Sequence, residues 1–123
     1  MRRFYILVFV LLATAFSRGD ASVLPGQDAA KVNAKYINVK LDNDRVRVFE
    51  STVKPGEKEA VHSHPASIIY VIEGGKIRNH AADGSVAEVE LKTGDVLYRE
   101  PVTHWAENIG TNTTRLVIVE LKN

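Results

Sequence analysis

Apolar residues recur at every second position along most of this chain, which is the pattern of strands that bury one face. The alternation predicts about eight short strands, at residues 36–41, 46–52, 67–73, 77–80, 86–91, 96–98, 104–108 and 113–121. Turn sequences separate these segments, among them Lys54-Pro55-Gly56 and Asp83-Gly84. No stretch of the chain after residue 21 shows a sustained helical repeat.

Many short strands in a chain of 123 residues predict one all-β domain, either a sandwich or a barrel. The last strand, residues 113–121, is strongly apolar, and in an open sheet its unpaired edge would favour aggregation. Closure into a barrel removes that edge. We therefore expect a β-barrel over residues 35–123 that can enclose a small cavity.

The first part of the chain has a different composition. Basic residues at positions 2 and 3 precede an apolar run at 4–16, and small and polar residues follow it. This layout predicts a secretory signal peptide over residues 1–21, followed by a linker or N-terminal arm over residues 22–34. We expect a secreted or periplasmic protein with no membrane attachment after cleavage; a retained N-terminal anchor is the alternative.

Charge and cysteine content limit the kinds of partner and site. The net charge is +1 and a quarter of the residues are charged, which gives no electrostatic basis for binding nucleic acid. We therefore expect a small-molecule ligand or substrate. The chain has no cysteine, so a metal site would have to use nitrogen and oxygen ligands.

Two of the four histidines, His62 and His64, stand one residue apart just before a run of β-formers. Alternation along a strand puts both on the same face, where two imidazoles can reach one metal ion. The alternative is that both lie in water at the rim of a sheet. His104 begins another strand some forty residues later, and nothing in the local sequence sets its direction.

These segments together resemble the paired motifs of the cupin superfamily. Residues 55–74 resemble the first motif, with Pro55-Gly56 and His62-Ser63-His64-Pro65. Residues 94–108 resemble the second motif, with Gly94-Asp95 and His104. The resemblance implies a small cupin jelly-roll barrel, the double-stranded β-helix. It also implies that His62, His64 and His104 bind one divalent metal ion (Fe, Mn, Zn or Ni), and that two copies form a homodimer through their sheets.

The chain departs from the family pattern at the fourth ligand. Alignment places Ser67 where the family has a metal-binding glutamate, and counting forward from His64 gives Ile68 or Ile69 instead. Three interpretations stay open. Three histidines alone could hold the metal, Ser67 could bind a metal-bound water, or the barrel could work without metal.

The residues therefore support two functional hypotheses. One is a metal-dependent enzyme, a small-molecule oxygenase or isomerase, that works through His62, His64 and His104. The other is a metal-free barrel that binds a ligand or dimerises without catalysis, in which the pocket residues Ser67, Tyr70 and Trp105 matter more than the histidines. Trp105 could equally belong to the core, Glu100 and Glu107 are the carboxylates nearest His104 in sequence, and His80 receives no role.

Overall fold

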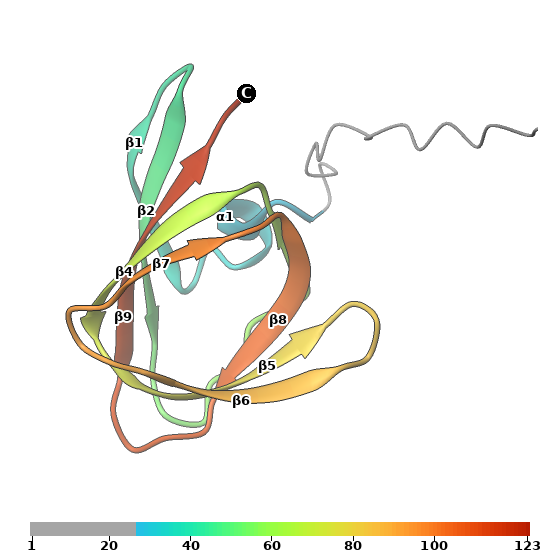
Figure 1. Ribbon diagram of the computed structural model, residues 1–123, viewed down its shortest axis with the longest axis vertical. Coiled ribbons are helices and arrows are strands. Elements are labelled where there is room, and N and C mark those ends of the chain that lie inside the picture. Colours follow the sequence, from blue (N-terminus) through green and yellow to red (C-terminus); the bar gives the residue numbers. More distant parts are fainter. Residues whose placement is uncertain (1–26) are drawn as a thin grey trace, which may run out of the picture.

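The computed structural model describes residues 27–123, so the predicted signal segment and the first part of the predicted arm lie outside the described residues. Within this range the chain forms two antiparallel sheets that face each other, with one short helix at one end (Figure 1). The predicted all-β barrel is confirmed. None of the helices in the described part is long or apolar enough to cross a membrane.

The five-stranded sheet has the order β1-β2-β9-β4-β7. Its strands are β1 (Ile37–Asp42), β2 (Val46–Val53), β9 (Thr114–Leu121), β4 (Ser67–Glu73) and β7 (Val96–Arg99). The four-stranded sheet has the order β3-β8-β5-β6. Its strands are β3 (His62–His64), β8 (Val102–Asn108), β5 (Gly75–Ala81) and β6 (Val86–Leu91). Because strands far apart in sequence are neighbours in both sheets, the chain crosses repeatedly from one sheet to the other.

The pairing register arranges the inner side chains of the five-stranded sheet in layers. Phe49, Ile118 and Ile69 stand side by side across β2, β9 and β4, and all three are buried. Two residues further along each strand, the inner face becomes polar, with Arg47, Glu120 and Ser67 in the same order. The barrel therefore has an apolar core next to a polar end, and the histidine-bearing β3 lies at that end.

A one-turn helix, α1 (Ala29–Val32), was not predicted by periodicity, because four residues are too short to show a helical repeat. Ala29 is completely buried against Phe49, Ile69 and Ile118. The helix contacts β1 of one sheet and β3 of the other. It therefore covers the polar end of the barrel and joins the two sheets there.

We expect Gly74→Ala to lower the free energy of unfolding by about 3 kcal/mol, because overpacking against fixed backbone is costly. A Cβ at Gly74 would lie 2.1 Å from the Leu91 carbonyl oxygen and 2.9 Å from the Thr93 nitrogen. The control is Gly84→Ala, where nothing lies within 4 Å but φ is +88°. The control should lose only about 1–2 kcal/mol, the cost of the left-handed conformation. Urea unfolding followed by Trp105 fluorescence measures both, and equal losses would contradict the steric account.

Candidate metal site

The structure brings His62, His64 and His104 together inside the barrel. β3 pairs with β8 so that His62 lies directly opposite His104, and alternation places His64 on the same inner face. The three residues are only 1%, 4% and 4% exposed. Their ring centroids lie 4.7–5.4 Å apart, and one ligand atom from each lies within 4.8 Å of the others. The prediction that these three histidines form one cluster is therefore confirmed.

Each imidazole uses its Nδ1 atom in a hydrogen bond to the protein. His62 Nδ1 lies 2.7 Å from the Ala60 carbonyl oxygen, and His64 Nδ1 lies 2.8 Å from Glu120 Oε2. His104 Nδ1 lies 2.5 Å from Asn79 Oδ1, on β5. Since the Asn79 oxygen is an acceptor, the proton of a neutral His104 ring is assigned to Nδ1, and the lone pair is left on Nε2. His62 Nδ1 lies between an acceptor, the Ala60 oxygen, and a donor, Asn33 Nδ2 at 2.8 Å.

The environment keeps two of these rings neutral. Burial lowers the pKa of His62 to about 4, although the hydrogen bond to Ala60 acts in the opposite direction. Burial lowers the pKa of His104 to about 2, and the nearby charge of Arg99 lowers it further. Both rings therefore carry a free lone pair at neutral pH, as a metal ligand must. His104 Nε2 is also one of two buried side-chain polar atoms without a hydrogen-bond partner among the described residues.

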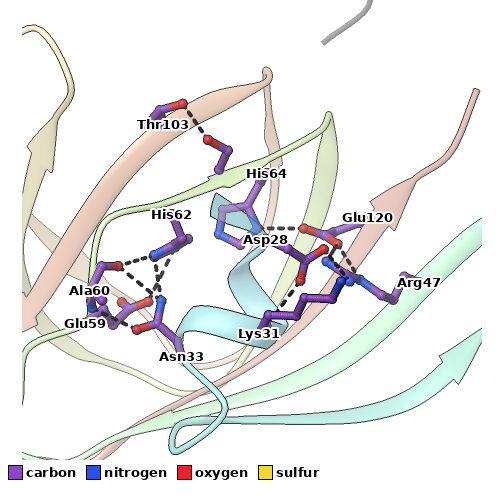
Figure 2. A network of polar contacts seen from close by, with 11 residues as sticks. Asp28, Lys31, Asn33, Arg47, Glu59, Ala60, His62, His64, Thr103 and Glu120 are labelled. Carbon is purple, nitrogen blue, oxygen red and sulfur yellow. Dashed lines mark hydrogen bonds and ion pairs between the residues drawn. The ribbon is translucent and has the colours of Figure 1, made fainter. Parts of the chain in front are cut away.

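Side chains behind the cluster hold two of the rings in place (Figure 2). The Asn33 amide bonds both the nitrogen and the oxygen of Ala60, the residue that orients His62. Glu120 lies between His64 and Arg47. Such supporting contacts fix the tautomer and the direction of a metal-binding histidine.

Arg47 and Asp28 extend this support to α1. Arg47 Nη1 donates to Asp28 Oδ2 at 2.8 Å, and Arg47 Nε donates to Glu120 Oε1 at 2.8 Å (Figure 2). Burial opposes the charge of Asp28, but the hydrogen bond and charge of Arg47 bring the pKa of Asp28 below its usual value. The buried Glu120 carboxylate is thus matched by a guanidinium that is itself held by a second carboxylate.

A further carboxylate, Glu59, lies beside the cluster. Its Oε2 atom is 3.5 Å from His62 Nε2, and its side chain is only 13% exposed. Burial raises the pKa of Glu59 to about 7, while the charge of Arg99 acts in the opposite direction. Glu59 precedes β3, and its backbone nitrogen bonds the Ala106 carbonyl of β8, which places the residue at the barrel wall.

Neither carboxylate of this region is predicted by the sequence pattern. Glu59 lies outside the predicted strands and three residues before the His-x-His pair, where the family pattern expects no ligand. Glu120 lies 56 residues from His64, so only the pairing of β9 with β4 shows that it faces the cluster. Alternation along the last strand was the one signal that could have placed Glu120 inside.

The three predicted pocket residues have different surroundings. Ser67 is buried on the inner face at the histidine end, and its Oγ has no hydrogen-bond partner among the described residues. Tyr70 lies on the outer face and is 46% exposed. Trp105 follows the inward-facing His104 on β8 and therefore points outward. There it stacks on His80, with ring centroids 3.6 Å apart. The structure therefore brings Ser67, but neither Tyr70 nor Trp105, to the histidine cluster.

The two carboxylates nearest His104 in sequence also lie away from it. Glu107 accepts a hydrogen bond from Arg78 at 2.9 Å and lies 3.2 Å from His80 Nε2. Glu100 is exposed in the connection between β7 and β8. The orientation of β8 explains the position of Glu107, because it lies three residues from the inward-facing His104 and alternate residues of a strand point to opposite faces.

The fold and the site together define a double-stranded β-helix with a candidate metal site. The family model for the cupin domain matches residues 49–120, more than half of the chain. The chain therefore belongs to the cupin family.

Solved structures agree with this assignment. A cupin domain from Bordetella pertussis Tohama I is 26% identical, with a TM-score of 0.65, over 71% of this chain and 92% of that one. An uncharacterized conserved protein with a double-stranded β-helix domain from Klebsiella pneumoniae is 30% identical, with a TM-score of 0.57, over 71% and 76%. An RmlC-like cupin family protein from Methanocaldococcus jannaschii is 17% identical, with a TM-score of 0.57, over 73% and 84%, and shows the shared fold alone. No curated protein matches the chain.

We expect Glu120→Gln to destabilise the metal-free protein by about 3 kcal/mol, because it leaves the buried Arg47 with only Asp28 as a charged partner. Glu50→Gln is the control, since Glu50 pairs with Arg115 on the outer face of the same sheet. Loss of that surface pair should change stability little. Urea unfolding of both variants gives the comparison, and equal stabilities would argue against a central role for Glu120.

Proposed function

We propose that this cupin binds one divalent metal ion through His62, His64 and His104 and acts on a small oxygenated molecule inside the barrel. The observation that carries the proposal is the shared arrangement of the three rings. Each has its Nδ1 hydrogen-bonded to the protein, and their ligand atoms lie close together in a buried site. A buried ring nitrogen without a partner, such as His104 Nε2, is costly unless its lone pair is used.

The donor set fits the metals that the resemblance implies. Imidazole nitrogen suits iron, manganese, zinc and nickel, and three neutral ligands leave positions for water or substrate. When bound, such a metal would supply a Lewis-acid or oxygen-binding centre, as oxygenase or isomerase chemistry requires.

Glu59 would supply the carboxylate that this chain lacks at Ser67, where the family pattern has a glutamate. Two atoms bound to one metal at about 2.1 Å lie roughly 3.0–3.4 Å apart in octahedral or tetrahedral geometry. The 3.5 Å between Glu59 Oε2 and His62 Nε2 is close to that spacing. Glu59 would therefore approach the metal from the side of His62, before the His-x-His pair rather than after it.

The test is elemental analysis of the protein purified without a histidine tag or chelator. We expect about one metal ion per chain, and loss of that metal in His62→Ala and in His104→Ala, because each variant removes a ligand. His80→Ala is the matched control, since His80 stacks on Trp105 away from the cluster. Stoichiometric metal retained in both ligand variants would contradict the proposal.

The contribution of Glu59 is measured in the same series. Glu59→Gln should keep the metal but bind it about ten- to a hundredfold more weakly, which competition with a chelator quantifies. Glu57→Gln is the control, because Glu57 instead accepts from the Lys54 backbone and pairs with Lys35. Equal affinities in the two variants would remove Glu59 from the ligand set.

Pairing with a second copy, with or without metal, is the second candidate role. The observation that favours it is a row of apolar side chains on the outer face, one from each strand of the five-stranded sheet. Their order across the sheet is Leu41, Val48, Val119, Ile68 and Tyr98. The row extends for roughly 19 Å at the usual strand spacing, and an exposed apolar face of this extent favours association.

We expect Ile68→Lys/Tyr98→Lys to make the protein monomeric, because two buried charges would oppose pairing of this face. Light scattering coupled to size-exclusion chromatography gives the mass of each species. Val86→Lys is the control, since Val86 is also exposed but belongs to the other sheet. A wild-type protein that is already monomeric would contradict the homodimer.

Export is part of the proposal as well. It is supported by the composition of residues 1–21, which lie outside the described residues.

A further inference from the structure

The inner face of the five-stranded sheet carries a row of polar side chains at its histidine end. The register places Arg47, Glu120, Ser67 and Arg99 next to one another across β2, β9, β4 and β7. Residues directly opposite on neighbouring strands share a face and have Cβ atoms about 5 Å apart. Arg99 therefore belongs to the same wall of the barrel as Glu120, the residue that binds His64.

The two ends of this row differ in charge balance. Arg47 forms ion pairs with Glu120 and Asp28. Arg99 has no ion pair within 4.0 Å and no side-chain hydrogen bond among the described residues, although it is partly buried. A partly buried guanidinium without a hydrogen-bonded acceptor loses part of its hydration, and an anionic ligand would offset that cost.

Arg99 also acts electrostatically on the histidine cluster. Its positive charge lowers the pKa of both His62 and His104, and burial lowers the pKa of Arg99 itself. Glu59 is the carboxylate whose charge favours the protonated Arg99, but the two groups do not form an ion pair. The guanidinium thus adds positive charge beside His62 and His104, which burial keeps neutral.

Ser67 provides a second, independent indication. It is 1% exposed, stands directly opposite Arg99, and its Oγ has no hydrogen-bond partner among the described residues. A buried hydroxyl left without a partner costs about 1–3 kcal/mol. The row therefore contains a cation and a hydroxyl donor side by side, both without an acceptor.

We propose that Arg99 and Ser67 form a subsite that binds the carboxylate of a small organic acid, with the other end of the acid directed to the histidine cluster. The inference deepens the proposed metal-binding function by naming a substrate class for the same barrel. The planar guanidinium fork matches the two oxygens of a carboxylate, and the Ser67 hydroxyl supplies a third donor. Arg99 and a divalent metal together favour an anion over a neutral molecule.

Malonate is the probe, because it is a small dicarboxylate: one carboxylate would bind Arg99, and the other would be available to the histidine end. Calorimetric titration uses the full-length protein, both metal-free and loaded with zinc. Malonamide has nearly the same size without charge and controls for shape, and inorganic phosphate tests another anion. We expect malonate to bind, malonamide not to bind, and phosphate to bind more weakly than malonate.

Three substitutions locate the subsite. Arg99→Gln should weaken malonate binding at least tenfold, because it removes a charge-assisted bidentate pair. Ser67→Ala should weaken it less, because one neutral hydrogen bond is lost. Arg78→Gln is the matched control, since Arg78 lies on the outer surface paired with Glu88 and Glu107, and its affinity should equal that of the wild type.

One more variant separates the effect of the Arg99 charge on malonate affinity from an effect on the stability of the fold. Arg99→Lys keeps the charge and loses the fork, so it should bind malonate with intermediate affinity; its unfolding curve shows whether the barrel tolerates a change here. Unchanged malonate affinity in both Arg99 variants would overturn the inference, as would equal binding of malonamide. Tighter binding of phosphate than of malonate would overturn the carboxylate assignment.

The same measurements keep this inference apart from the metal proposal. If malonate binding requires zinc and its affinity is unchanged in Arg99→Gln, the anion binds the metal alone. The subsite is then wrong, and the metal function stands. Arg99-dependent binding in a protein that takes up no metal means that the subsite stands and the metal function fails.

Discussion

A carboxylate can be buried only where cations or hydrogen-bond donors surround it, and Glu120 meets this condition at the point where the two sheets face each other. It belongs to β9 of the five-stranded sheet, and it bonds His64 on β3 of the four-stranded sheet. Arg47 satisfies its other oxygen and is itself held by Asp28 beside α1. This chain of charges joins both sheets and the helix, and it sets the direction of one ring of the candidate metal site.

The layered interior explains why the site lies at one end of the barrel. Phe49, Ile69 and Ile118 form an apolar layer that excludes water and gives the fold its core. The polar residues are confined to the neighbouring layer, where each charge can find a partner. Burial there keeps His62 and His104 neutral, and the surrounding polar groups orient the rings, which is the combination that metal binding needs.

The departure from the cupin pattern at Ser67 changes the charge distribution around the cluster without removing carboxylates from it. Glu59 and Glu120 approach from positions that the family motif does not use. Glu59 lies 3.5 Å from His62 Nε2, and Glu120 supports His64 from behind. The position left by the glutamate holds a small hydroxyl beside Arg99, which makes that part of the wall suited to an anion.

Alternation and turn residues were enough to determine the all-β class and the positions of most strands, because they reflect local backbone preferences and one-sided burial. Spacing also determined that His62 and His64 share a face. Only the tertiary structure decided what lies opposite them, since strand pairing between distant segments places His104, Glu120 and Arg99. It also decided that Tyr70 and Trp105 point outward, because a strand pattern alternates without saying which of its two faces is the inner one.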